Sequence, residues 1–290
     1  MFSFTNKEKK FSFILLGVGI LLAAIGLFTN LDNPTRLWTG LMYNHLFFMI
    51  IGLVAAFFVA SQTIGYNGWY VLIKRIPEAM MMYVPFMAIP MFLILFFGFD
   101  HIYHWGHADA VAHDKLLQGK APYLNAPFFF GRAVAYLALW SGLIFLVRRK
   151  SVSTDTNPDL KIYTRSKHIS ALFILVFAVT SSTYSWDWLM SIQPHWYSTL
   201  WGWYCFISVF VTCMSIVYLV VRYLQSQGYL KDVNQEHYHD LGKYMFAFSV
   251  AWAYLFYSQF MLIWYANIPE ETAYFKLRID EYPVVMYLCI

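Results

Sequence analysis

Apolar and polar residues follow one another along the chain in long blocks, and seven of the apolar blocks are long enough to cross a membrane. About 20 residues of helix, at about 1.5 Å each, span a hydrocarbon core of about 30 Å. A helix satisfies its own backbone hydrogen bonds in lipid, and the ten-residue alternation of barrel strands is absent from the sequence. The pattern therefore predicts an all-α, polytopic transmembrane helix bundle with helices at 11–29, 43–65, 79–99, 129–147, 169–189, 200–223 and 243–266.

The first and last apolar runs need separate interpretation. The first follows Lys7, Lys9 and Lys10, as a signal peptide would, but it is longer than a typical signal core and LFTNLDNPTRLW offers no cleavage site. We therefore expect a retained helix. The final run, PVVMYLCI at 283–290, is too short to cross, and we expect the natural chain to continue beyond it.

Lysine and arginine predict the orientation of the helices. With the N-terminus inside, fourteen of the 20 basic residues fall on inner segments and six on outer ones. Positive charge favours the cytoplasmic side. The predicted location is the bacterial inner (cytoplasmic) membrane, multi-pass, with a cytoplasmic N-terminus.

Composition supports a membrane protein and weakens several other classes. The chain is 60% hydrophobic and only 12% charged, about half the charge of an ordinary soluble domain. The net charge of +4 therefore concerns topology, and no nucleic-acid partner is expected. Cys205, Cys213 and Cys289 lie in apolar runs without metal-ligand spacing, which favours a packing role.

The predicted outer end collects titratable side chains. Asp187 follows the fifth run within SSTYSWDWLMSIQPHWYSTLWG, residues 181–202. An aspartate costs about 2.5–3.5 kcal/mol at the bilayer centre and less near the interface. These groups either face lipid headgroups, with Arg132 as a partner for the aspartates, or together form a proton-exchanging vestibule. The outer set comprises His45 at the start of the second helix, Asp100, His101 and His104 at the end of the third, Arg132 at the start of the fourth, Asp187 at the end of the fifth and His195 in the loop beyond.

Further polar residues fall deeper in the membrane and at the inner end. Hydroxyl groups on the fifth and seventh helices could relay protons or simply join helices by hydrogen bonds. Acidic residues that open inner helix ends are either proton entrances or ordinary cap chemistry. These candidates are Tyr184, Tyr254, Tyr257 and Ser258 along the middle, and Glu78 and Asp240 at the inner mouth.

Two other functions stay open at this point. A quinol site at the outer face would need a proton acceptor and an apolar slot, which His104, Arg132, Asp187 and Trp188 could provide. A secondary transporter would use helices broken at mid-membrane, and Pro85 and Pro90 are the main candidates for such a break. A tightly bound haem is not expected, because the histidines are predicted near one edge rather than facing each other within the membrane.

Three long stretches resemble the F subunit of bacterial alternative complex III, which is similar to the NrfD-like membrane anchors of polysulfide and nitrite reductases. The resemblance extends from about residue 11 to 290 and includes Asp187, Trp188, Pro194, His195 and Trp196, and also Leu124, Asn125, Pro127 and Arg132. The stretches are SWDWLMSIQPHWYSTLWGWY, GKAPYLNAPFFFGRA and HDLGKYMFAFSVAWAYLFYSQFMLIWYANIPEET.

The resemblance implies a fold and a role. It implies an N-terminal segment and first helix (1–42), a complete four-helix bundle (43–190) and part of a second bundle (191–290). The implied role is to scaffold a respiratory quinol:cytochrome c, or quinol:oxidase-linked, oxidoreductase and to provide a proton-translocation path. The implied partners are a homologous NrfD-like membrane subunit, multihaem cytochromes c, an iron–sulfur subunit and a terminal oxidase. Haems and iron–sulfur clusters would belong to those partners. The only small molecules expected on this chain itself are lipids and quinone or quinol.

Overall fold

The computed structural model describes residues 6–30, 32–157, 159–284 and 286, and it confirms an all-α fold with seven helices of membrane-spanning length and composition within that part of the chain. The protein is a multi-pass helical membrane protein. Cys289 and most of the short final run lie outside the described residues. The long helices are α1 (Asn6–Thr29), α2 (Pro34–Ile64), α3 and α4 in succession (Arg75–Met81 and Tyr83–Ile102), α7 (Ala126–Thr156), α8 (Leu160–Tyr184), α9 (Trp201–Ser226) and α10 (Gln235–Ala266).

Short elements connect these helices, mainly at one end. The segment between α4 and α7 is partly helical, since it contains α5 and α6. The stretch after Tyr184 continues for one wide turn of π-helix before it ends. The short elements are η1 (Trp69–Leu72), η2 (His104–Gly106), α5 (Ala108–Ala112), α6 (Lys115–Lys120), the π-turn η3 (Ser185–Leu189), η4 (Met190–Ile192) and α11 (Pro269–Glu281).

The second helix begins earlier than its apolar run predicts. Asn33 caps it by accepting a hydrogen bond from the backbone nitrogen of Arg36 at 3.1 Å, and Pro34 occupies the first turn, where no N–H is needed. The predicted start at residue 43 is therefore wrong by nine residues. His45 consequently lies well inside the helix rather than at its opening.

Four helices form a ring, in which α2 contacts α4, α4 contacts α7, α7 contacts α8 and α8 contacts α2. α2 is apolar on all sides because neighbours surround it, and most of its central residues are buried. Gly52 permits close packing there, since a Cβ atom would lie 2.9 Å from the Met80 carbonyl oxygen. The bundle expected from residues 43–190 corresponds to these helices.

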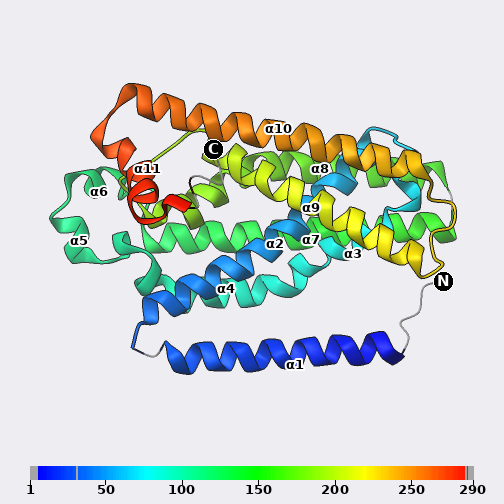
Figure 1. Cartoon of the computed structure of the whole chain (residues 1–290), viewed down its shortest axis with the longest axis horizontal. Coiled ribbons are helices and arrows are strands. Elements are labelled where there is room, and N and C mark those ends of the chain that lie inside the picture. Colours follow the sequence, from blue (N-terminus) through cyan, green and yellow to red (C-terminus); the bar gives the residue numbers. More distant parts are fainter. Residues whose placement is uncertain (1–5, 31, 158, 285, 287–290) are drawn as a thin grey trace.

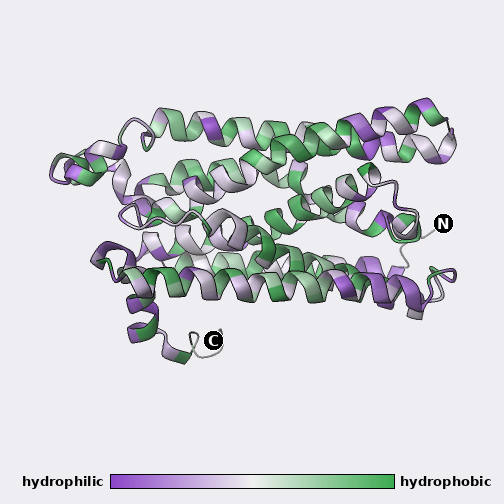
Figure 2. Cartoon of the chain, turned by 90° about the horizontal axis from the view of Figure 1, so that it is seen from above, coloured by the Kyte–Doolittle hydropathy of each residue, from purple (hydrophilic) through white to green (hydrophobic). Residues whose placement is uncertain are grey.

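The remaining helices lie outside this ring. α9 packs on α2 and α8, and α10 packs on α9 (Figure 1). α1 runs beside the bundle, and none of its membrane-spanning window is buried. Hydrophilic residues gather at the two ends of the molecule and apolar residues between them (Figure 2). We call these ends the α6 end, which also holds α5 and α11, and the N-terminal end.

Candidate functional site at the two ends of the four-helix bundle

Asp187 is the centre of the polar cluster at the α6 end. It lies in the π-turn that follows α8, and its side chain is fully buried. π-turns within helices are frequent at functional sites. The carboxylate therefore does not face lipid headgroups, which was one of the two positions its sequence neighbourhood allowed.

Arg132, on α7, neutralises this carboxylate. Its Nε and Nη2 atoms donate to Oδ2 and Oδ1 of Asp187 at 2.7 and 2.9 Å. Tyr136, one turn further along α7, donates its hydroxyl to Oδ2 at 2.9 Å. This paired arrangement uses the planar donor fork of arginine and gives both geometry and charge compensation.

Aromatic rings enclose the pair. The Arg132 guanidinium carbon lies 4.0 Å from the Tyr123 ring centre and 4.1 Å from that of Phe128. Trp188 is fully buried beside Tyr136, and its carbonyl accepts a hydrogen bond from Tyr103 at 3.1 Å. Burial, with a smaller contribution from the Asp187 charge, raises the pKa of Tyr123. The rings exclude water, so each charge depends on the other.

A second polar contact at the α6 end joins His195 to Asp114, and we call it the Asp114–His195 clasp. The Nε2–Oδ2 distance is 2.5 Å, and the side chains are 53% and 27% exposed. Asp114 also caps α6 through the backbone N–H groups of Leu116 and Leu117. Partial burial alone would raise the pKa of Asp114, but the hydrogen bonds from His195 and from the α6 backbone lower it overall.

A cavity of about 550 Å³ at the same end is lined by residues within 119–124 and by residues of the stretch from Trp186 to Tyr197. Lys120, at its edge, donates to the Pro194 carbonyl at 2.6 Å, and burial lowers the pKa of this lysine. Ser191 lines the cavity and donates to the Asp187 backbone carbonyl at 2.5 Å. Trp186 and Trp196 also line it, and their indole N–H groups are buried without a hydrogen-bond partner among the described residues. The wall of the cavity therefore contains two buried indole donors that are unpaired among the described residues.

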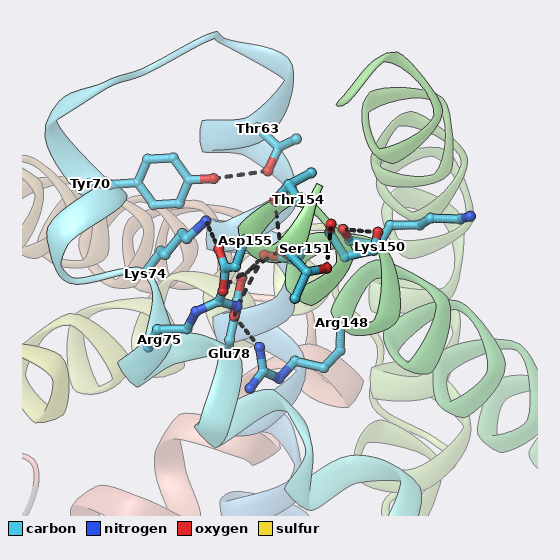
Figure 3. A network of polar contacts seen from close by, with 12 residues as sticks. Thr63, Tyr70, Lys74, Arg75, Glu78, Arg148, Lys150, Ser151, Thr154 and Asp155 are labelled. Atoms are coloured by element: carbon cyan, nitrogen blue, oxygen red, sulfur yellow. Dashed lines mark hydrogen bonds and ion pairs between the residues drawn. The ribbon is translucent and has the colours of Figure 1, made fainter. Parts of the chain in front are cut away.

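The N-terminal end of the bundle holds the second buried carboxylate, Glu78 (Figure 3). Arg148 donates to its Oε2 at 2.6 Å, and Arg75 and Ser151 also contact the carboxylate. Arg75 continues to Asp155, which lies 3.6 Å from Lys74. The network joins α3 to the last turns of α7. Glu78 is thus a shared acceptor for two arginines rather than an isolated cap residue.

The expected outer vestibule is divided into separate pairs. Asp187 pairs with Arg132, and His195 pairs with Asp114. Asp100 and His104 have exposed side chains, and His104 lies beside His107 at 6.3 Å between ring centres. His45 contacts the Met87 carbonyl. The structure therefore does not gather the acids and imidazoles into one pocket. The Arg132–Asp187 pair is sealed inside the bundle, His45 lies within α2, and the remaining groups are exposed or partly exposed at the end of α4 and in the segments beyond the long helices.

The predicted mid-membrane residues are also separated. Tyr184 is 1% exposed and packs against Trp140 and Trp188. Tyr254 and Tyr257, on α10, are 69% and 61% exposed, and Ser258 is half-buried. Asp240 pairs with Lys243 one turn along the same helix at 2.8 Å. Tyr184 of α8 therefore lies in the core, whereas Tyr254 and Tyr257 of α10 lie on the surface.

The sequence interpretation missed three important partners: Asp114, Tyr136 and Ser151. One signal was present, because Arg132, Tyr136 and Trp140 recur every four residues and share one helix face. Trp140 uses that face to donate to Thr180 of α8 at 2.9 Å. The long-range contacts of Asp114 and Ser151 had no such local pattern.

Within the described part of the chain, no three His, Cys, Asp or Glu side chains come together as a metal site requires. Comparison of the chain with protein-family models and with curated proteins finds no match.

Proposed function

We propose that this chain is a membrane subunit of a respiratory quinol:cytochrome c, or quinol:oxidase-linked, oxidoreductase, and that its four-helix bundle provides a proton path. The observation that carries the proposal is the pair of fully buried carboxylates, Asp187 and Glu78, at opposite ends of one bundle. Ionisable groups at membrane depth are costly and mark functional sites. The quoted stretches that resemble the F subunit of alternative complex III support the choice of complex.

The proposed path follows α7 and α8. From Asp187 it passes to Tyr136 and then to the hydroxyl of Thr180, which accepts a hydrogen bond from Trp140. Ser170 of α8, which is fully buried, lies towards the Glu78 network. Between these polar sections the bundle is apolar, with Ile144 and Phe173 fully buried. Proton passage therefore requires water to enter this section during turnover. Tyr254, Tyr257 and Ser258 are left outside the path because they lie on α10.

The scaffolding part of the proposal rests on the outer surface. α10 exposes Tyr254 and Tyr257 within its membrane-spanning segment. Tyrosine is usual at membrane interfaces, where its hydroxyl meets water. A partner helix would satisfy these hydroxyls at greater depth. The proposed partners are a homologous NrfD-like membrane subunit, multihaem cytochromes c, an iron–sulfur subunit and a terminal oxidase, and the proposed location is a bacterial inner membrane with the N-terminal end in the cytoplasm.

The test is the number of protons moved per electron in the intact complex, purified through a tag on this chain and reconstituted in vesicles. Asp187→Asn keeps the shape and the hydrogen bond from Tyr136 but removes the titratable group, so the ratio should fall. Asp100→Asn, which neutralises an exposed carboxylate at the same end, is the matched control. A normal ratio in assembled Asp187→Asn complex removes Asp187 from any path. Purified complex without haem or iron–sulfur partners contradicts the respiratory assignment.

The quinol-site alternative receives support from one observation, at residues other than those predicted. His104 is exposed and the Arg132–Asp187 pair is sealed, whereas the wall of the cavity of about 550 Å³ contains Trp186 and Trp196, whose buried indole N–H groups have no hydrogen-bond partner among the described residues. These donors suit the carbonyl oxygens of a quinone. Trp196→Phe should then weaken quinone binding to the purified complex, and unchanged binding would reject the alternative.

A further inference from the structure

The cavity between α1, α2 and α4 differs from the site already described in position and chemistry. It has a volume of about 450 Å³ and is lined by residues of all three helices. α1 otherwise stands beside the bundle with its membrane-spanning window unburied (Figure 1). The cavity therefore occupies the junction at which the first helix meets the rest of the protein.

His45 brings a titratable ring to this cavity from within the membrane-spanning helix α2. It lies eleven residues, or about 16 Å, from the start of α2. Its Nε2 is 3.0 Å from the carbonyl oxygen of Met87, which lies near the centre of the span Arg75–Ile102. A polar ring at this depth is a functional-site candidate by its cost alone.

Asn30, Asn44 and His45 line the cavity and direct donors to backbone carbonyls, and Arg36 and Tyr83 line it as well. Asn44 donates its amide to the Gly40 carbonyl at 2.8 Å, and Asn30 donates to the Gly26 carbonyl at 2.8 Å. His45 must carry its proton on Nε2, because that nitrogen faces a carbonyl, which can only accept. In the neutral ring Nδ1 is then an acceptor. The acceptor capacity that remains is Nδ1 of His45 and the two amide oxygens.

Two glycines leave the space open. Gly26 and Gly40 both line the cavity, and a Cβ atom at either position would meet no heavy atom within 4 Å. Each glycine also supplies the carbonyl that takes an asparagine donor. Glycine destabilises a helix by about 1 kcal/mol relative to alanine. Helix stability therefore does not explain glycine at these two positions.

We propose that this cavity binds a neutral lipid that carries a hydroxyl group, with the hydroxyl donating to the acceptors of His45 and Asn44 and the apolar body lying between α1 and α4. A neutral molecule fits the inner part of the cavity because His45 and the Met87 carbonyl lie inside membrane-spanning helices, where charge is costly. Phe48 and Leu41 provide the apolar wall. Arg36 lies at the exposed rim towards the α6 end. The proposal goes beyond the respiratory role and does not depend on it.

The first experiment uses the unaltered protein in nanodiscs with a diazirine-bearing farnesol. Photolabelled peptides should come from the α1 and α2 segments that line the cavity. Farnesol should compete about fivefold better than its methyl ether, which lacks the donor, since one hydrogen bond contributes about 1 kcal/mol. Equal competition by the ether, or labelling spread evenly over the outer helices, overturns the proposal.

Variants then test the position of the site. Gly40→Leu fills the cavity without altering a polar group and should reduce labelling at least about tenfold. Gly142→Leu, at an exposed and equally open helix position on α7, is the matched control and should leave labelling unchanged. His45→Phe should abolish the preference for alcohol over ether. Normal labelling in Gly40→Leu contradicts the assignment even if His45→Phe fails to fold.

The source of the hydroxyl is distinguished by a second competitor pair. A short-chain hydroquinone carries two hydroxyl groups at the ring, and its two-electron oxidised quinone has two carbonyl acceptors in their place. Stronger competition by hydroquinone than by farnesol identifies a quinol as the occupant, and the reverse identifies an aliphatic alcohol lipid. Preference for the oxidised quinone contradicts recognition by acceptors. No proton pumping enters these measurements, so their failure leaves the Asp187 test intact.

Discussion

Asp187 and Glu78 are both fully buried carboxylates, but their partners differ in access to water. At the α6 end, Asp187 has one guanidinium, that of Arg132, whose side chain is only 11% exposed. At the N-terminal end, Glu78 has two, from Arg75 and Arg148, whose side chains are 35% and 30% exposed. One cluster is therefore a sealed pair and the other a network at the edge of solvent.

This difference determines how each cluster tolerates loss of a partner. In the sealed pair, a remaining charge has no water and no second counter-ion. In the Glu78 network, a remaining arginine can turn towards water, and a remaining carboxylate keeps a second arginine and Ser151. The strength of exposed ion pairs is small, whereas an unpaired buried charge is costly.

The largest expected effect comes from Arg132→Leu. It leaves the Asp187 carboxylate buried without its counter-ion and should lower the free energy of unfolding by about 3–5 kcal/mol. Thermal unfolding of the purified protein in detergent measures the change. The control is Arg132→Leu combined with Asp187→Leu, which removes both charges and should recover much of the loss. Equal destabilisation of the single and double variants would show that the pair is not sealed.

Glu78→Gln should have a smaller effect, about 1–2 kcal/mol, because the two arginines are partly exposed and regain hydration. The same unfolding measurement applies. Asp155→Asn, which alters a half-exposed member of the same network, should change stability very little. A loss for Glu78→Gln as large as that for Arg132→Leu would remove the distinction between the two ends.

The smallest effect concerns the pH dependence of the Asp114–His195 clasp. Because the pKa of Asp114 is lowered in the folded protein, its stabilising contribution is complete above the ordinary value of 3.8 and is lost as pH falls through the lowered value. The difference in melting temperature between the unaltered protein and Asp114→Asn should therefore shrink as the pH falls from about 5 to below about 4. A difference that grows as the pH falls through this acid range contradicts this sign.

The apolar pattern carries different information in the middle and at the ends of the helices. The seven membrane-spanning helices were predictable, because lipid requires continuous apolar residues in each crossing segment. The boundaries were less predictable. α2 begins at Pro34 because of the Asn33 cap, and that change of nine residues places His45 well inside the helix rather than at its opening.

The candidate sites show the same division between local and long-range information. Burial of Asp187 beside Arg132 was one of the alternatives that the sequence allowed. Its sealing by Tyr123 and Phe128 depends on how the loop before α7 folds back over the guanidinium. The contacts of His195 with Asp114 and of Glu78 with Arg148 join residues 81 and 70 positions apart.

The sequence by itself determined that this protein is an all-α membrane protein with seven helices long enough to cross the membrane, because hydrophobic length and backbone hydrogen bonding are local requirements. Only the tertiary structure decided which polar groups meet. Helices α2, α4, α7 and α8 enclose Asp187 and Glu78 at opposite ends, and α1 leaves a cavity beside His45. Pairing of this kind depends on the rotation of each helix about its axis and on its axial position relative to its neighbours. An apolar run of sequence determines neither.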